Sequence, residues 1–230
     1  MLSQLISAFR GGHVDFMSII MQLLAYAVII FLVLPFHEWA HAFTALKLGD
    51  TSVKYRGRLS LNPMAHIDVM GALCLIFFGF GWAKPVPINP RNFKNDKVGM
   101  AITAAMGPVA NFVAALVGAL IYFALAVFFP DMEESTAGSY FMLFLTFYIS
   151  VNVSLAVFNL LPIPPLDGSK ILFVFLPNRI VNYFYQYEQV IMIALFAMLW
   201  MGILDYPLML LSNLLLNAVY YLASLPFFWA

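Results

Sequence analysis

Three polar side chains stand close together inside an apolar stretch, and their spacing is that of a metal site. His37, Glu38 and His41 are the only histidine or charged residues between Ile19 and Leu46. Two histidines four residues apart on a helix share one face, with Cβ atoms about 6 Å apart, and this spacing suits two ligands of one zinc ion. The glutamate beside the first histidine can take a proton from an attacking water. The pattern therefore indicates a zinc hydrolase.

A short H-E-x-x-H pattern also arises by chance on soluble helices, so its surroundings matter. Burying His and Glu in a membrane is costly, and an intramembrane cluster of this kind is a functional site by default. The alternative is a structural pair of interhelical hydrogen bonds. We favour the zinc site because the cluster sits inside a run long enough to span a bilayer.

Composition places the chain in a lipid bilayer. Of its 230 residues, 63% are hydrophobic and only 10% are charged, and the mean hydropathy is +0.92; soluble domains are about 25% charged. The formal net charge is zero and there is no basic block, so we expect no nucleic-acid partner. The single cysteine, Cys74, excludes an intramolecular disulfide and a thiol zinc site.

Apolar runs predict an all-α polytopic membrane protein with about five to six transmembrane helices. The runs that carry this prediction are residues 17–46, 98–129, 140–161, 166–176, 190–204 and 208–227. Between the first and second crossings, residues 51–61 alternate in polarity and predict a short β-hairpin. Residues 67–80 are apolar but short for a crossing, which favours a re-entrant segment.

Basic residues predict the orientation. Lysines and arginines gather in residues 47–58 and 84–97, and the loop after the second crossing is acidic. Basic loops are retained in the cytoplasm, so we expect residues 47–66 and 81–97 on that side, residues 131–138 outside and the C-terminus inside. His41 lies six residues before Lys47, about 9 Å of helix from the cytoplasmic exit. The active site is therefore expected nearer the cytoplasm.

A third zinc ligand is needed, and Asp167 is the best candidate. It follows Pro162-Ile163-Pro164-Pro165-Leu166 between two apolar helices, where irregular backbone is tolerated only if protein or a cavity covers it. The alternative is a surface turn with a helix-capping aspartate. His66 is the next candidate, whereas His13 lies in a polar segment and is expected to be solvated.

Separated motifs carry a resemblance to a known family. H-E-x-x-H early in the chain, followed much later by the run from Asn159 to Gly168, resembles the site-2 protease family of intramembrane zinc metalloproteases. Gly107-Pro108-Val109-Ala110-Asn111 is similar to that family's G-P-x-x-N element. The runs 57–68 and 81–87 resemble its compact bacterial and archaeal branch, which carries no PDZ or CBS domain. Residues 30–180 carry the resemblance.

The resemblance implies roles for individual residues. His37, His41 and Asp167 would bind one Zn²⁺ per chain, Glu38 would be the general base, and Asn159 would orient the substrate or the oxyanion. A hydrogen bond from Asn159 to freed carbonyls is the alternative. Asn111 is expected to brace the core, and His66 to make a structural hydrogen bond or to stand behind the ligands.

The residues between the first two crossings suggest how a substrate is held. A helix hides its peptide bonds, so a substrate span must unwind before attack. The 81–90 loop could provide an edge that pairs with it, because Val86 is the one residue between Pro85 and Pro87 with an N–H. The alternative is a loop that only covers or packs.

The resemblance therefore implies one integral membrane protease domain, residues 1–230, with a core at 19–180 and additional C-terminal helices at 181–230. It would cleave transmembrane protein substrates in or near their spans, as in regulated intramembrane proteolysis, in the cell membrane of a prokaryote. A metal-binding membrane transporter or an inactive scaffold that binds transmembrane helices is the alternative. Against these stand the absence of an inverted repeat and the intact set of His37, Glu38, His41 and Asp167.

Overall fold

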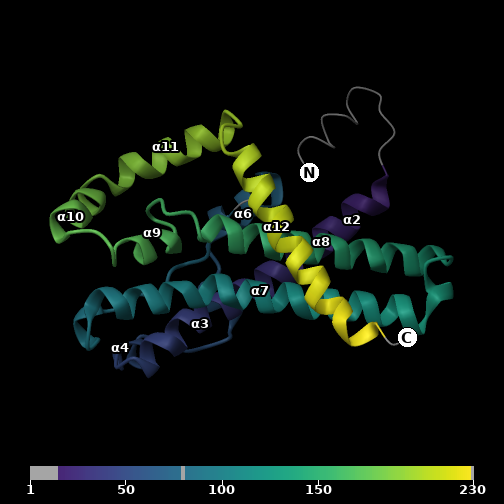
Figure 1. The fold of residues 1–230 in the computed structure, drawn as a ribbon, viewed down its shortest axis with the longest axis horizontal. Coiled ribbons are helices and arrows are strands. Elements are labelled where there is room, and N and C mark those ends of the chain that lie inside the picture. Colours follow the sequence, from purple (N-terminus) through teal and green to yellow (C-terminus); the bar gives the residue numbers. More distant parts are fainter. Residues whose placement is uncertain (1–14, 79–80, 229–230) are drawn as a thin grey trace.

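Helices dominate the computed structural model, which describes residues 15–78 and 81–228 (Figure 1). Four helical stretches are long and apolar enough to cross a membrane. They are α2–η1–α3 (Phe16–Val28, Ile29–Val33, Leu34–Lys47), α7 (Asp96–Phe128), α8 (Thr136–Asn159) and α12–η4 (Asp205–Ser224, Leu225–Phe227). The shorter helices are α4 (Ser52–Tyr55), α5 (Pro63–His66), α6 (Val69–Phe78), α9 (Asp167–Leu172), α10 (Asn178–Gln186) and α11 (Glu188–Trp200), with 3₁₀ turns η2 (Pro90–Asn92) and η3 (Pro130–Met132).

A proline shapes the first crossing just before the histidine pair. Pro35 has no N–H and its ring clashes with the carbonyl four residues earlier. The helix meets this by widening into the π-helical turn η1 over Ile29–Val33, where the Leu34 N–H donates to the Ile29 carbonyl. A single turn of π-helix lets an otherwise regular helix continue past such an obstacle. The crossing therefore runs on into α3 and presents His37, Glu38 and His41 one turn later.

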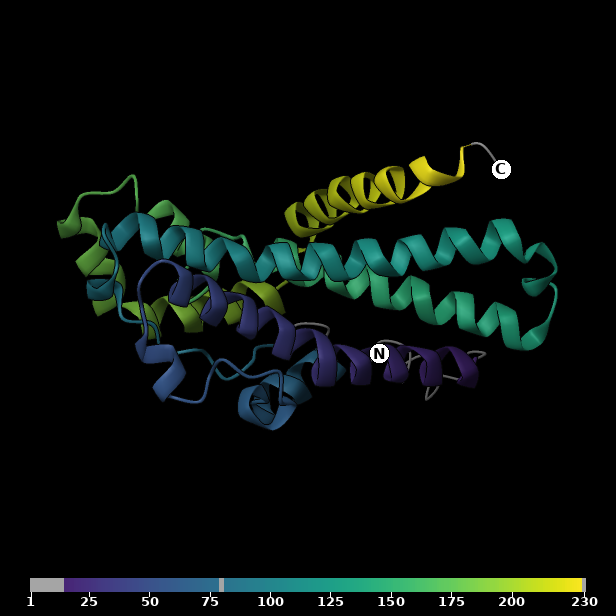
Figure 2. The ribbon, with the colours of Figure 1, turned by 90° about the horizontal axis from the view of Figure 1, so that it is seen from below.

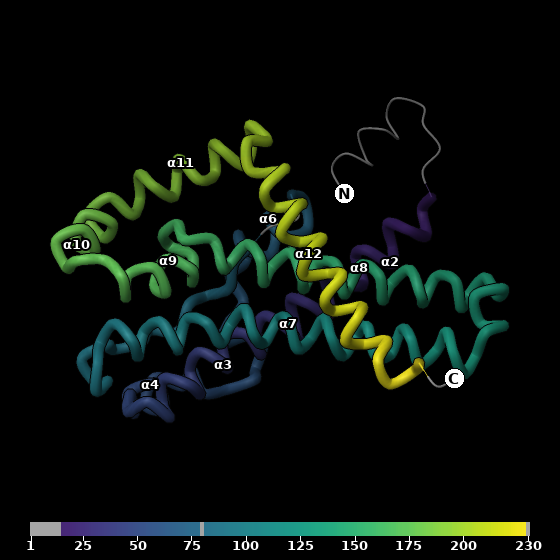
Figure 3. The backbone as a smooth tube through the Cα atoms, in the orientation of Figure 1, coloured from purple at the N-terminus to yellow at the C-terminus, as the bar shows by residue number. Residues whose placement is uncertain are grey.

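Helices α7 and α8 form an antiparallel hairpin at the centre of the molecule (Figure 2). The first crossing lies on one face of this hairpin, with α3 against α7 and α2 against α8, while α12 crosses the opposite face. Small residues let α7 and α12 approach closely, since Ala115, Ala119 and Ala223 are fully buried with Val219. Such small-residue contacts are typical of helices that pack in membranes. The chain after α8 runs through α9 and α10 and turns back through α11 and α12 (Figure 3).

The predicted β-hairpin over residues 51–61 is wrong. Among the described residues there is no strand, and this stretch forms α4 and turns. The cause is local, because the Asp50 carboxylate accepts hydrogen bonds from the Ser52 N–H and hydroxyl, which starts a helical turn. Gly57 then reverses the chain with a φ of 66°, a conformation that favours glycine.

The four long helices are fewer than the five to six crossings expected. The predicted crossings at 98–129 and 140–161 are confirmed as long apolar helices, α7 and α8. The run 166–176 contains only the six residues of α9, and the run 190–204 overlaps only with α11, which has 13 residues in all. Helix α6 has ten residues, about 15 Å of helix, so it is too short for a crossing. Residues 79 and 80 of that predicted re-entrant segment lie outside the described residues.

The end of α12 lies at the other end of the bundle from the basic loops, contrary to the prediction that both face the same side. Phe227, at the end of η4, packs against Phe128 at the end of α7, with ring centroids 6.1 Å apart. Phe128 adjoins the acidic turn, so α12 ends at the opposite end of the bundle from the basic loops (Figure 2). The prediction failed because α11 and α12 together make one return path, whereas the sequence suggested two crossings.

Candidate metal centre

Three elements bring the predicted ligands together. His37 and His41 lie on α3, Asp167 opens α9, and both helices pack against α7. The two histidine Nε2 atoms are 3.1 Å apart, and Asp167 Oδ2 lies 3.4 Å from that of His37 and 3.3 Å from that of His41. Both histidines are buried and the Asp167 side chain is only 13% exposed. The sequence-predicted set is thus a compact triangle of ligand atoms.

The triangle fits a zinc ion. Ligand atoms arranged tetrahedrally about zinc at about 2.0–2.2 Å lie about 3.3–3.6 Å from one another, close to the separations of 3.1 to 3.4 Å seen here. Two neutral imidazole nitrogens that face each other with lone pairs repel unless a cation or a proton lies between them. The donor set of two imidazoles and one carboxylate is one that zinc uses with an open fourth position.

Hydrogen bonds on the far side of each ring set the tautomer. His37 Nδ1 lies 3.2 Å from Asn111 Oδ1, and His41 Nδ1 lies 2.7 Å from the Thr103 carbonyl oxygen. Both acceptors require Nδ1 to carry the proton, so each Nε2 presents a lone pair to the centre of the triangle. Asn111 therefore does more than brace the core, because it orients a predicted ligand from α7.

The Gly107-Pro108 pair makes α7 fit against the imidazoles. A Cβ atom at Gly107 would lie 2.4 Å from His41 Nε2 and 2.5 Å from His37 Nε2. Pro108 cannot donate to the carbonyl of Ala104, which opens the hydrogen-bond ladder beside the Thr103 carbonyl that accepts from His41. The motif thus removes a steric obstacle and loosens the helix backbone at the same turn.

Gly168 places Asp167 in a similar way. A Cβ atom at Gly168 would lie 2.1 Å from the Leu160 carbonyl oxygen, so glycine lets α9 begin against the end of α8. The residue before the helix is Leu166, which makes no side-chain capping bond. The carboxylate of Asp167 faces the histidines. Asp167 therefore does not cap a helix in a surface turn, which was the alternative.

Glu38 lines the same cavity as the triangle of ligand atoms, and its hydrogen-bond partner could not be predicted from the sequence. Glu38 Oε2 accepts a hydrogen bond of 3.1 Å from the backbone N–H of Val86, and both residues are buried. The prediction that this N–H is available to pair with a substrate is wrong for this conformation. Here it holds the predicted general base, so residues 81–92, which we call the strap, lie over the site.

The carboxylate of Asp50 anchors the strap through hydrogen bonds. It is fully buried and accepts hydrogen bonds from the Asn89 N–H at 2.8 Å and the Asn92 side chain at 2.7 Å. Burial raises the pKa of this carboxyl group, but the hydrogen bonds from Asn89, Ser52 and Asn92 outweigh it, and the pKa is lowered from the usual 3.8. Gly49 permits this approach, since a Cβ atom there would lie 2.8 Å from the Asn92 carbonyl oxygen.

A cavity of about 580 Å³ surrounds the triangle. Its wall is mainly apolar and comes from α3, α7, the end of α8, the strap and α11, whose Phe196 contacts Trp82 with ring centroids 5.7 Å apart. The ionisable residues in the wall are His37, Glu38, His41, Asp167 and Lys170. The cavity is large enough for several residues of an extended peptide, and its apolar wall strengthens electrostatic effects.

The remaining predicted residues lie at different distances from this chemistry. Asn159 lines the cavity, but its Nδ2 donates to the Leu155 carbonyl of its own helix at 3.0 Å. His66 is buried and its Nε2 lies 2.7 Å from the Ser60 carbonyl oxygen, so it makes the structural hydrogen bond and is not part of the cavity wall. His13 lies outside the described residues.

Comparison with known proteins places the chain in a family. Residues 125–202 match the model of peptidase family M50. The chain is 37% identical over 153 residues to YwhC of Bacillus subtilis, which is named as a zinc metalloprotease, covering 66% of this chain and 69% of YwhC. It is 33% identical over 137 residues to the Rip2 zinc metalloprotease of Mycolicibacterium smegmatis, covering 57% of this chain and 49% of Rip2. It is 30% identical over 158 residues to Rip2 of Mycobacterium tuberculosis, covering 64% of this chain and 58% of that protein.

No solved structure gives a significant match. The chain belongs to peptidase family M50, the site-2 protease family, and the resemblance carried by its motifs is confirmed. It is an integral membrane protein and an intramembrane zinc metalloprotease.

Proposed function

We propose that His37, His41 and Asp167 bind the zinc ion and that Glu38 is the general base. The triangle of ligand atoms, with Glu38 beside it in one apolar cavity, carries this proposal. When bound, zinc supplies Lewis acidity, which polarises a carbonyl group and activates water. One zinc per chain follows, since the residues supply one such triangle among the described part of the chain.

Glu38 is suited to hold and move a proton. Its Oε2 is fixed by the Val86 N–H, which leaves Oε1 to take a proton from the attacking water and pass it to the amine that leaves. General bases placed within hydrogen-bond reach contribute about 100- to 10,000-fold in rate. The strap that fixes Glu38 also forms part of the cavity wall.

Asn159 is assigned to orienting the substrate. It lines the cavity close to the end of α8, and a turn about its side-chain bonds would free its amide from the Leu155 carbonyl to meet a substrate carbonyl. The apolar wall suits an unwound transmembrane segment, whose side chains are themselves apolar. The substrates are therefore spans of membrane proteins, cut in or near the bilayer as in regulated intramembrane proteolysis.

Residues 1–230 are proposed to act as one membrane protease domain, with its core at 19–180 and additional helices at 181–230. In the cell membrane of a prokaryote, the basic residues 47–97 face the cytoplasm and the acidic turn at 131–138 faces outward. The four long helices then carry the chain in, out, in and out, so that α12 ends outside beside Phe128. The triangle lies nearer the cytoplasm.

Cysteine labelling tests this orientation. In a Cys74→Ser background, cysteines at Ser52, Asn92 and Ser135 are exposed one at a time to a membrane-impermeant reagent in intact cells. Only the Ser135 position should react. Equal labelling at the Ser52 and Ser135 positions would disprove the orientation while leaving the chemistry untouched.

The reaction is tested with purified protein and a model transmembrane substrate. Glu38→Gln should lower cleavage by about 100-fold or more while the zinc content stays at that of the wild type. Gln keeps the shape and can still accept the Val86 hydrogen bond, but it cannot take a proton. Wild-type turnover in Glu38→Gln would show that the base is another group.

A further inference from the structure

The two carboxylate oxygens of Asp167 face different partners. Oδ2 points at the histidines, 3.4 Å from His37 Nε2 and 3.3 Å from His41 Nε2. Oδ1 lies 3.6 Å from the ammonium nitrogen of Lys170. The carboxylate is therefore divided between the proposed metal centre and one cation.

Lys170 is itself held in place. It lies three residues after Asp167 on α9, a spacing that puts both side chains on one face of a helix. Its Nζ also donates to the Pro165 carbonyl oxygen at 3.0 Å, which ties it to the irregular segment before α9. Among the described residues of the cavity wall, Lys170 is the one lysine or arginine.

An ordinary surface ion pair at this spacing is the simpler interpretation, and it explains less. Pairs between exposed side chains contribute little, because solvent screens them and both side chains stay mobile. Here the Asp167 side chain is 13% exposed and that of Lys170 is 28% exposed. One partner is a residue of the proposed metal centre and the other has a second, backbone anchor.

We propose that Lys170 is a positioning residue that acts through Asp167. By occupying Oδ1, its ammonium group leaves Oδ2 alone to face the two histidines. The carboxylate would then offer one oxygen to a bound zinc ion, which would leave one coordination position for water, as catalytic zinc sites require. This inference rests on the proposed function, since it concerns the same metal centre.

Cobalt tests the inference by a readout other than cleavage. The purified wild type, Lys170→Met, Lys170→Arg and the control Lys54→Met, which makes the same change at an exposed position of α4, are loaded with Co²⁺. Visible absorption reports coordination number, because four-coordinate Co²⁺ absorbs more strongly than five-coordinate Co²⁺. Zinc affinity is measured alongside by competition with a chelator.

The expected result is a weaker cobalt band in Lys170→Met, because the freed Oδ1 joins the metal. Lys170→Arg and Lys54→Met should keep the wild-type spectrum. A wild-type cobalt spectrum in Lys170→Met would overturn the inference and leave the proposed function standing. Failure of the wild type itself to bind zinc or cobalt would instead overturn the proposed function, and this inference with it.

Discussion

The metal triangle and the strap lie on either side of Glu38, and they are built in different ways. The triangle sits on helices whose close packing depends on Gly107 and Gly168, at each of which a Cβ atom would clash. The strap contains only the short 3₁₀ turn η2 within residues 81–92. It is held by hydrogen bonds to Glu38 and Asp50 and by the packing of Val86 and Ile88 in a hydrophobic cluster with α3 and α4. Helix packing resists displacement, whereas a few hydrogen bonds can be exchanged for those of a substrate.

This difference indicates that the strap, and not the triangle, moves when a substrate enters the cavity. An extended peptide entering the cavity has to reach the space between Glu38 and the triangle, and the strap covers that space. Peptide N–H groups of a substrate could replace the Val86 N–H at Glu38, while nothing in a substrate could replace the packing of Gly107 against the imidazoles. We therefore expect changes to the triangle to cost zinc, and changes to the strap to alter access.

The largest effect is expected at Gly107. In Gly107→Ala the new methyl group would overlap both imidazoles, so α7 must shift, at a cost of about 1–3 kcal/mol. Zinc content and cleavage should both fall steeply in the purified protein. Val109→Ala, at an exposed position of the same helix, is the control and should retain both. Full zinc content in Gly107→Ala would mean that α7 does not set the histidine positions.

A smaller effect is expected at Asn111. Asn111→Leu keeps the branched shape but removes the acceptor for His37 Nδ1, and the loss of such a partner lowers metal affinity by about 10- to 100-fold. Chelator competition measures it directly. Asn111→Asp keeps an acceptor and should bind zinc more tightly than Asn111→Leu. Equal affinities for the two variants would show that this hydrogen bond does not matter.

The smallest effect is expected at Asp50, and a change there should alter only the accessibility of the cavity. Hydrogen bonds to a charged group contribute about 1.5–3 kcal/mol, so Asp50→Ala should raise thiol labelling of Val86→Cys, in a Cys74→Ser background, by about tenfold or more. Zinc content should not change. Unchanged labelling would mean that other contacts hold the strap.

The hydrogen bonds that Asp50 makes to the strap predict that accessibility of the cavity depends on pH. The pKa of Asp50 is lower in the folded protein than its usual 3.8, so its stabilising contribution is complete above about pH 4 and is lost as the pH falls through the lowered pKa. Labelling of Val86→Cys, divided by the labelling of a free thiol at the same pH because only the thiolate reacts, should therefore stay constant from neutral pH to about pH 5 and rise only in stronger acid. Asp50→Asn should remove that rise.

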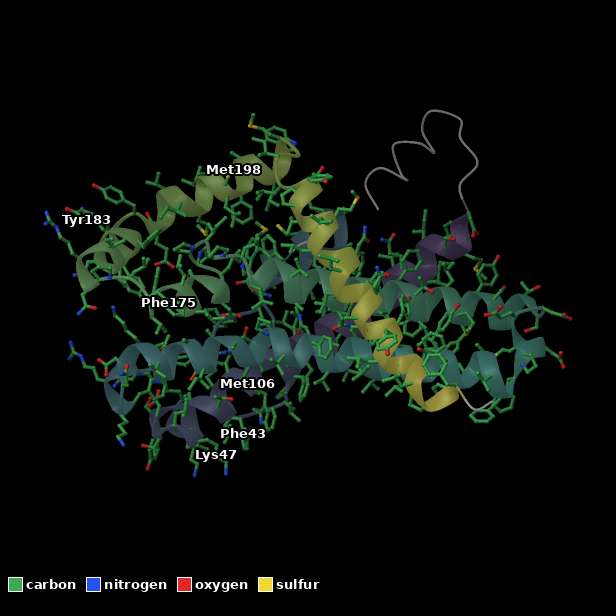
Figure 4. All side chains as sticks on the ribbon, viewed as in Figure 1. Phe43, Lys47, Met106, Phe175, Tyr183 and Met198 are labelled. Atoms are coloured by element: carbon green, nitrogen blue, oxygen red, sulfur yellow. The ribbon has the colours of Figure 1, made fainter. Side chains whose placement is uncertain are left out.

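Partly exposed aromatic residues of α3 lie outside the cavity wall. Trp39 stacks on Phe43 with ring centroids 4.9 Å apart, and the Lys47 ammonium group lies 5.3 Å from the centre of the Phe43 ring. Figure 4 shows Phe43 and Lys47 next to each other on the outer side of α3. Aromatic rings and a lysine at a helix end are typical of a membrane interface, which agrees with an interface at this end of α3.

The sequence was sufficient for the triangle and for the central hairpin. His37 and His41 follow from helix spacing, Asp167 from a carboxylate in an apolar region that needs a cation, and α7 and α8 from uninterrupted apolar runs. The close packing of α7 against α3 could not be predicted from the sequence. The role of a glycine such as Gly107 becomes visible only when the positions of the facing imidazoles are known. The Gly-Pro pair was the one available signal.

Long-range hydrogen bonds were the other gap. The Val86 N–H was recognised as the one donor between two prolines, yet its partner lies 48 residues earlier in the chain. The Asp50 carboxylate turned residues expected to be strands into a helical turn. Apolarity alone likewise could not tell that α11 is too short to cross and continues into α12.

The most direct test of the central claim is the zinc content of purified protein. The wild type should hold one zinc per chain, and His37→Ala, His41→Ala and Asp167→Ala should each lose most of it, while His66→Ala should bind zinc as the wild type does wherever it folds. Cleavage of the model substrate should follow the zinc content across this series. Stoichiometric zinc and full activity in Asp167→Ala would contradict the assignment of the triangle as the catalytic metal site.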